Sequence, residues 1–200
     1  MTPPTELPVL GAGPRPRSDA VRNRALILGA ADRLFRERGV ECTSMDVIAQ
    51  AAGVGKGTLF RRFGDRSSLV RALLEEREAA FQESFIRGAP PLGPGAAPAD
   101  RLVAFGHGVL DMLDCSGDLV LAAETGAPGV RFRASVYQAH RTHVQTLVRA
   151  GAPELDAGYT ADALLAMLGA ELVMHQLRGR GVPLDELKDG FEAVARCVIS

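Results

Sequence analysis

Apolar residues spaced three and four apart, in runs that glycine and proline interrupt, constrain this fold more than any other feature. The spacing recurs along most of the chain from about residue 19 onward and places apolar side chains on one face of an α-helix. No segment shows the sustained alternation of apolar and polar residues that is typical of a half-buried β-strand. We therefore expect an all-α protein of about nine helices.

Glycine, proline and capping residues predict where these helices begin and end. In the N-terminal part the expected helices are 19–38, a short one from Thr43-Ser44 to Gly53, 56–63, and one from Asp65 to about Ile86. After a loop at 88–99, rich in Pro and Gly, further helices are expected near 99–114, 117–124, 129–150, 160–178 and 184–199. Residues 1–17 carry five prolines and predict a disordered arm.

Charge is distributed unevenly, although the whole chain has a net charge of −1. Residues 15–78 hold 13 Lys and Arg against 9 Asp and Glu, whereas residues 79–200 hold 10 against 14. A basic N-terminal part and an acidic C-terminal part indicate two functions, and we expect any polyanion to bind the N-terminal part.

The chain also carries sequence features that bear on its compartment. Three cysteines lie far apart and match no metal or redox spacing. The first residues lack a signal-peptide core, and no apolar run approaches the length of a membrane span. We expect a cytoplasmic protein with reduced thiols.

Residues 43–66, TSMDVIAQAAGVGKGTLFRRFGDR, predict two short helices joined by a tight turn. Gly53 suits the positive φ of the turn, and Leu59 and Phe63, four apart, anchor the second helix. The outer side of that helix shows Lys56, Thr58, Arg61 and Arg62, with glycines at 55 and 57. Small residues and cations suit the major groove of DNA, although helix pairs of this shape also occur as plain packing motifs.

These residues resemble the tetracycline-repressor (TetR) family of bacterial transcriptional regulators. The resemblance rests on Thr43-Ser44, IAQAAGV at 48–54, KGTLFRRF at 56–63 and Leu69, and it covers residues 20–75. It implies a three-helix DNA-binding head with a helix-turn-helix (18–64), then a connecting helix and a helical ligand-binding and dimerisation body (65–200). Later helices match the family by pattern and length only.

The resemblance also implies which residues contact DNA. They are Thr43, Ser44, Gly55, Lys56, Gly57, Thr58, Phe60, Arg61, Arg62 and Arg66. Lys56, Arg62 and Arg66 are expected mainly to attract phosphates, and Thr43 or Ser44 to cap the second helix. The chain departs from the family at Phe60, where Tyr is usual, and at Gly55, where Ser is common. Arg61 is equally well interpreted as a solvated residue.

The last two helices are the expected subunit interface. The resemblance makes them a four-helix contact between two copies through Leu164, Leu168, Leu172, Leu187, Phe191 and Val194. Without the family, ordinary packing inside a monomer is the better interpretation of the same apolar residues.

Several residues of the body are candidates for a pocket that holds a small organic effector. They are Phe105, His107, Met112, Phe132, Tyr137, His140, Met167 and Met174, each of which also fits an ordinary core. The pairs His140/His143 and Glu171/His175 have metal-ligand spacing, but nothing in the sequence joins them, so no metal or cofactor is assigned. The acidic body favours a largely apolar, neutral or weakly cationic molecule.

The expected function is that of a homodimeric regulator, a repressor by resemblance, that a small organic ligand releases from a palindromic operator. A metal-responsive or ligand-independent regulator of the same fold is the alternative. An enzyme is not expected, because no nucleophile with a base, paired carboxylates or cofactor loop occurs at recognisable spacing. The run GVGKGT lacks the spacing of a phosphate-binding loop.

Overall fold

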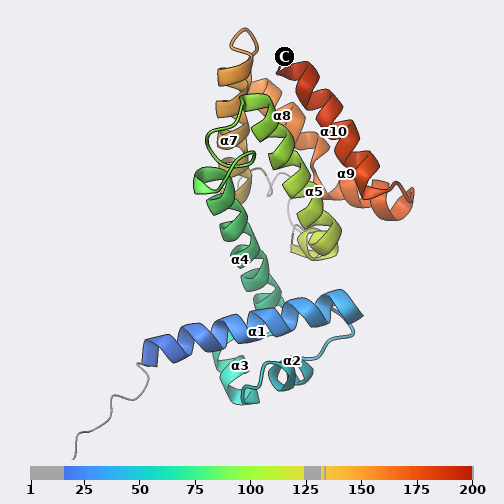
Figure 1. Cartoon of the computed structure of the whole chain (residues 1–200). Coiled ribbons are helices and arrows are strands. Elements are labelled where there is room, and N and C mark those ends of the chain that lie inside the picture. The colour runs from blue at the N-terminus through green and yellow to red at the C-terminus, as the bar shows by residue number, and fades with distance from the viewer. Residues whose placement is uncertain (1–15, 124–131, 133, 200) are drawn as a thin grey trace, which may run out of the picture. The chain divides into compact units, whose positions relative to one another are not determined.

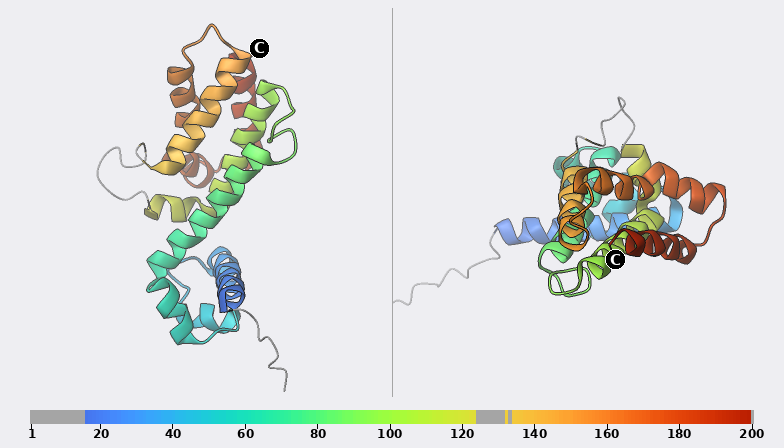
Figure 2. Two further views of the ribbon diagram at one scale, coloured as in Figure 1. Left: turned by 90° about the vertical axis from the view of Figure 1, so that its left-hand side faces the viewer. Right: turned by 90° about the horizontal axis from the view of Figure 1, so that it is seen from above.

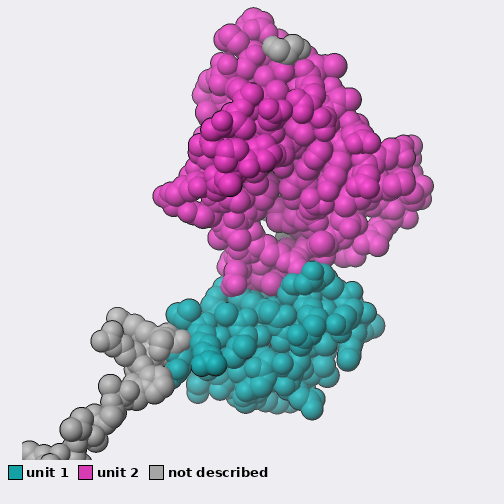
Figure 3. Space-filling model, in the orientation of Figure 1, with its two compact units in different colours: residues 1–69 teal, residues 70–200 magenta. Residues whose placement is uncertain are grey.

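The computed structural model describes residues 16–123, 132 and 134–199 (Figure 1). Every secondary-structure element within these ranges is helical, which confirms the all-α prediction. The predicted arm lies outside the described residues, apart from its last two positions at the start of the first helix. The chain divides into two compact units, residues 1–69 and 70–200, which Figure 3 colours separately.

Unit 1 consists of α1 (Pro16–Arg38), α2 (Met45–Ala51), α3 (Lys56–Phe63) and the first turn of α4 (Arg66–Arg87). These bounds agree with the predicted helices to within three residues. Helix α2 packs against both α1 and α3. The buried apolar side chains of the unit include Ile27, Leu28, Ala31, Leu34, Phe35, Ile48, Leu59, Phe63 and Leu69.

Local chemistry fixes the helix ends in unit 1. The hydroxyl of Ser44 accepts a hydrogen bond from the Val47 amide at 3.3 Å and caps α2. The carboxylate of Asp65 accepts one from the Ser68 amide at 2.7 Å at the start of α4. Gly64 follows α3 with a φ of 78°, a backbone conformation that side chains disfavour.

Unit 2 is a helical bundle built around one long helix (Figures 1 and 2). Helix α5 (Pro98–Ala123) contacts α7 (Ser135–Gly151), α9 (Ala170–Met174) and α10 (Leu184–Val198), and α7 also packs on α8 (Ala157–Met167). The core takes side chains from all of them, among them Leu102, Phe105, Leu113, Val144, Val148, Leu164, Leu168, Val173 and Phe191. A Cβ atom at Gly106 of α5 would overlap the Phe191 ring of α10, so this glycine permits the close approach of the two helices.

Two predicted boundaries in the body are wrong. We expected a break at 115–118, but α5 runs through these residues without interruption. A Cβ atom at Gly117 would overlap the Met174 side chain of α9. The glycine therefore makes room for a neighbouring helix and does not end its own.

The second error concerns the expected single helix at 160–178. Helix α8 ends at Met167, and α9 begins at Ala170 after Gly169 adopts an extended ψ of 132°. A π-helical turn, η1 (His175–Gly179), follows α9. The described chain therefore changes direction inside the most apolar segment of unit 2.

That apolar segment has an unusual surface. Residues Ala157–Gly179 form the described stretch that is long and apolar enough to cross a membrane, with a mean hydropathy of 1.2, a test that core helices of soluble proteins also pass. Of its 18 most apolar consecutive residues, only 44% are buried within this chain. The exposed residues of the segment include the apolar Ala163, Ala166 and Leu172.

Candidate nucleic-acid interface

The turn between α2 and α3 positions the second helix of the predicted motif. Gly53 takes a φ of 66°, and the Val54 amide donates to the Ala49 carbonyl oxygen at 3.0 Å. Gly55 is the N-cap residue of α3, and its carbonyl oxygen accepts from the amides of Thr58 and Leu59. The predicted helix-turn-helix geometry is therefore present in unit 1.

The two faces of α3 differ sharply in burial. Leu59 and Phe63 are fully or almost fully buried, so they fix the rotation of the helix about its axis. The opposite face leaves Lys56, Gly57, Phe60, Arg61 and Arg62 exposed, with Thr58 half-buried between them. An exposed face with three cations and one aromatic ring is suited to contact with a polyanion.

The glycines of this face have no role in packing within the fold. A Cβ atom at Gly57 would meet nothing within 4 Å, and one at Gly55 only the Thr58 hydroxyl at 3.9 Å. Glycine inside a helix costs about 1 kcal/mol relative to alanine. Open space beside Gly57 is what a partner needs in order to approach the backbone of α3.

Two cations of α3 have no partner within the described chain. Neither Arg61 nor Arg62 makes a hydrogen bond or ion pair with the described residues, and both are exposed. Their guanidinium groups are therefore available to an external anion. Residues 16–69 as a whole hold ten Lys and Arg against six Asp and Glu.

Lys56 is different, because its charge is engaged. Its ammonium nitrogen lies 2.7 Å from a carboxylate oxygen of Asp46 on α2 and 5.8 Å from the centre of the Phe60 ring. All three side chains remain exposed. No local sequence pattern pairs these two residues, because they lie 10 residues apart on different helices.

Thr43, one of the expected DNA contacts, is buried in the head. This residue is 1% exposed, and its hydroxyl donates to the carbonyl oxygen of Gly39 at 2.8 Å. A buried hydroxyl that joins the end of α1 to the start of α2 does not reach a phosphate. Ser44 is the cap of α2 and the residue of the pair that remains exposed.

Arg66, also expected to bind phosphate, stabilises the head itself. Its guanidinium donates to the carbonyl oxygens of Val40 and Glu41 at 3.0 and 3.1 Å and lies 2.7 Å from the Glu41 carboxylate. These contacts tie the loop after α1 to the first turn of α4. The guanidinium is thus engaged within the head, and the expected phosphate contact of Arg66 stays a prediction.

The predicted pocket residues of the body do not gather at one place. Phe105 and His140 lie together in the core, with ring centres 5.1 Å apart. Met174 lies against Gly117, whereas Met167 lines a groove elsewhere and Met112 is half-buried on α5. His107 lies near α10, with Nε2 3.2 Å from the Lys188 carbonyl oxygen.

A buried polar pair lies within the aromatic core of the body. Nε2 of His140 is 2.8 Å from Oε1 of Glu78 on α4, and both residues are buried. His143 stacks on Phe85 with ring centres 4.4 Å apart. Burial, with the nearby Arg101 and His140, lowers the pKa of His143 to about 4, so this imidazole is neutral at physiological pH.

The histidine pairs considered for a metal are not assembled into a site. His140 is engaged with Glu78, and Glu171 and His175 are both exposed on other helices. Among the described residues, no group of three or more His, Cys, Asp or Glu side chains is arranged to hold a metal ion.

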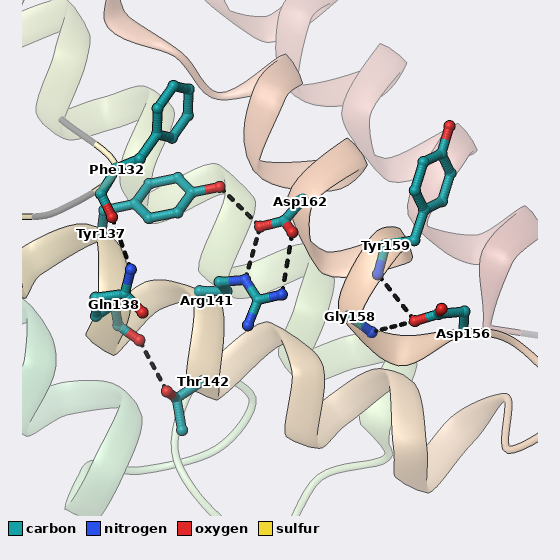
Figure 4. Close-up of polar contacts among 9 residues, drawn as sticks. All are labelled: Phe132, Tyr137, Gln138, Arg141, Thr142, Asp156, Gly158, Tyr159 and Asp162. Atoms are coloured by element: carbon teal, nitrogen blue, oxygen red, sulfur yellow. Dashed lines mark hydrogen bonds and ion pairs between the residues drawn. The ribbon is translucent and has the colours of Figure 1, made fainter. Parts of the chain in front are cut away.

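Phe132 and Tyr137, also expected in the pocket, belong to a network between α7 and α8 (Figure 4). Their rings meet edge to face at 5.1 Å, and the Tyr137 hydroxyl donates to Asp162 at 2.9 Å. Arg141 donates to both carboxylate oxygens of Asp162, at 2.8 and 3.1 Å. These hydrogen bonds, that of Arg141 first, lower the pKa of the Asp162 carboxyl group and join the two helices.

The six predicted interface residues divide into core and surface. Leu164, Leu168 and Phe191 are at most 6% exposed and belong to the core of unit 2, and Leu168 and Phe191 also line a groove at its surface. Leu172 and Val194 are 45% and 39% exposed, and Leu187 is half-buried. Near them lies a groove of about 320 Å³ between α5, α8, α9 and α10, whose lining includes Leu110, Met167, Leu172, Leu187 and Gly190.

The contacts of Arg66 generate a stability prediction. Replacing Arg66 with alanine removes three interactions from unit 1, and we expect the free energy of unfolding to fall by about 1–3 kcal/mol. Urea denaturation followed by circular dichroism measures the change. Arg62→Ala is the matched control, and its effect should stay within about 0.5 kcal/mol because its side chain is exposed and unpaired. Equal stability of the two variants would contradict the role assigned to Arg66.

Comparison with known proteins places the N-terminal part of the chain in a family. Residues 27–73 match the family model for bacterial regulatory proteins of the tetR family. An HTH-type transcriptional regulator from Staphylococcus aureus (strain bovine RF122 / ET3-1) is 51% identical over 69 residues, which are 34% of this chain and 37% of that protein. The chain thus matches little more than a third of the length of this curated relative.

Solved structures extend the likeness to the whole fold. A TetR-like transcriptional regulator from Rhodococcus sp. RHA1 is 25% identical, with a TM-score of 0.61 over 92% of this chain and 96% of that one. AibR, solved in complex with isovaleryl coenzyme A and operator DNA, is 21% identical, with a TM-score of 0.58 over 86% and 97% of the two chains. Residues 27–73 therefore match the TetR family of bacterial regulatory proteins, and the helical fold of the chain is similar along most of its length to that of a TetR-like regulator.

Proposed function

We propose that the chain is a dimeric DNA-binding transcriptional regulator of the bacterial cytoplasm, a repressor that a small organic effector releases from a palindromic operator. The observation that carries the proposal is the outer face of α3, where Arg61 and Arg62 are exposed and unpaired beside the open backbone of Gly57. The family's regulators are the basis for a regulatory function, and we propose no catalytic activity.

Charge and shape together support a major-groove position for α3. The helix presents cations that neutralise phosphates and, at Gly55 and Gly57, a backbone without side chains that a groove wall can approach closely. The exposed ring of Phe60 offers an apolar contact for a thymine methyl group. A short helix held by a second helix and a tight turn is the geometry with which helix-turn-helix proteins read DNA.

The prediction for DNA binding concerns the unpaired arginines. Arg61→Ala and Arg62→Ala should each weaken binding to all duplex sequences, because a phosphate contact is independent of sequence. Each lost contact should make the dependence of log K on log salt shallower by about 0.9. Binding to a duplex of random sequence, measured by fluorescence anisotropy at several salt concentrations, tests this.

The control is Arg149→Ala, which removes the same charge from an exposed position on α7. It should leave the salt dependence unchanged. If neither arginine of α3 alters the slope more than Arg149→Ala does, the docking of α3 proposed here is wrong.

An uncovered apolar surface on α8, α9 and α10 supports a dimer. These helices expose Ala163, Ala166, Leu172, Ala193 and Val194, and Leu172 also lines the groove of about 320 Å³. The segment 157–179 is apolar overall yet less than half buried, which in a globular protein indicates contact with another chain. A second copy related by a two-fold axis covers this surface and pairs the heads for a palindromic operator.

The prediction for assembly uses the two large exposed side chains of this surface. Leu172→Glu and Val194→Glu should each convert a dimer into a folded monomer at micromolar concentration, because a charge would be buried without a partner. Sedimentation velocity and circular dichroism give the mass and the fold. Leu155→Glu is the control, since Leu155 is 40% exposed in the α7–α8 loop and should leave the dimer intact. A monomeric wild-type protein would rule the interface out.

We assign the effector to the body, since AibR, a protein of similar fold, was solved in complex with both isovaleryl coenzyme A and operator DNA. In this chain, residues 70–200 hold 12 Lys and Arg against 17 Asp and Glu, which favours a largely apolar, neutral or weakly cationic molecule. Glu78 on α4 pairs with His140 on α7 inside the aromatic core. Because α4 starts in unit 1 and continues into unit 2, a ligand that disturbs this pair acts on the helix that leads to the head.

Release from the operator is tested through the thermodynamic linkage between ligand binding and DNA binding. Apolar neutral compounds and hydrophobic amines would be screened by thermal shift, and the best binder titrated calorimetrically with and without an operator obtained by binding-site selection. We expect operator DNA to weaken ligand binding by the same factor by which ligand weakens DNA binding. Equal ligand affinity in the two titrations would leave a regulator that does not respond to the ligand.

A further inference from the structure

Three exposed side chains on the α2–α3 surface form an assembly that the proposed function does not require. Asp46 lies in the first turn of α2, Lys56 begins α3, and Phe60 follows one turn later. The Lys56 ammonium is 2.7 Å from the Asp46 carboxylate and 5.8 Å from the Phe60 ring centre. The aromatic face and the carboxylate both attract the cation.

Helix electrostatics explain why Lys56 is engaged in this way. The N-terminal end of α3 carries the positive end of the helix dipole, which disfavours a cation there. The first turn of α2 favours the carboxylate of Asp46 for the same reason. The Lys56 ammonium and the Asp46 carboxylate therefore lie together at the N-terminal ends of α3 and α2, and their two charges sum to zero.

The same helix thus carries two kinds of cation. Arg61 and Arg62 are exposed and unpaired, whereas Lys56 is held by a carboxylate on a different helix. A phosphate that approaches Lys56 also meets the negative charge of Asp46. Lys56 is consequently a poor partner for phosphates, even though its side chain is 62% exposed.

We infer that Asp46 is a specificity-determining residue, which withholds the charge of Lys56 from the phosphates of arbitrary DNA sequences. The inference rests on the proposed DNA contact of α3. Phosphate attraction supplies essentially all of non-specific binding, so a residue that reduces it raises the ratio of specific to non-specific affinity. Lys56 and Asp46 remain side by side as a hydrogen-bond donor and an acceptor. Base edges in the major groove present the acceptors and donors with which such side chains pair.

The experiment measures the salt dependence of binding to a short duplex of random sequence. Asp46→Asn removes the negative charge and frees Lys56, so the slope of log K against log salt should become steeper by about 0.9 for one added phosphate contact. This corresponds to roughly eightfold tighter binding for each tenfold decrease in salt, relative to wild type. Asp46→Ser, whose hydroxyl also suits a first helical turn, should behave in the same way.

A double-mutant cycle assigns the effect to Lys56. In the wild-type background Lys56→Ala should leave the slope nearly unchanged, and in the Asp46→Asn background it should remove the whole increment. Glu37→Gln is the matched control, because it deletes the same charge from an exposed position on α1 with no partner among the described residues. Circular dichroism melting verifies that each variant is folded.

The outcomes separate this inference from the function on which it rests. A wild-type protein that binds no duplex at low salt overturns the proposed function and the inference with it. A wild-type protein that binds, with slopes unchanged in both Asp46 variants or an increment equal to that of Glu37→Gln, overturns the inference alone. An increment that survives Lys56→Ala also overturns it.

Discussion

The burial of Leu59 and Phe63 on one side of α3 is the interaction on which the proposed function of the head depends. The helix has only eight residues, too few to be stable alone in water, and these two side chains hold it. Fully burying a Leu or Phe contributes about 1.5–3 kcal/mol each. Rotating α3 by half a turn would expose both anchors, so Lys56, Phe60 and the two arginines cannot exchange places with the buried face.

Partners that are distant in sequence decide what each charged residue can do. Lys56 and Arg66 have the same formal charge and lie in the same unit, yet one is paired across the α2–α3 turn and the other ties down a loop. Arg61 and Arg62 have no such partners and are the cations left for an external anion. A count of basic residues therefore overstates the attraction of this head for DNA phosphates.

The body is organised by the close approach of α5 to its neighbours. Glycines at 106 and 117 make room for Phe191 and Met174, so the side chains of α9 and α10 reach the centre of unit 2. Consequently part of the predicted interface is core, and the apolar surface that remains outside is smaller. That remainder, which includes the exposed Leu172 and Val194, is what the proposed dimer would bury.

The sequence by itself determined the helices of the head, because their signals are local. Ser44 caps α2, Gly64 ends α3, and the positions of apolar residues within each helix identify the buried faces. Such signals act over a few residues and need no knowledge of the fold. They also identified the surface of α3 proposed to meet DNA, since burial of one face exposes the other.

Only the tertiary structure decided whether a glycine ends a helix or leaves space for a side chain of a neighbouring helix. It also decided which carboxylate pairs with which cation. Gly117 and Gly169 look alike in sequence, yet α5 continues through the first and the chain turns at the second. The pairs Asp46–Lys56 and Glu78–His140 are 10 and 62 residues apart along the chain. These contacts depend on how helices pack, and that packing depends on the whole set of apolar faces at once, which no short pattern contains.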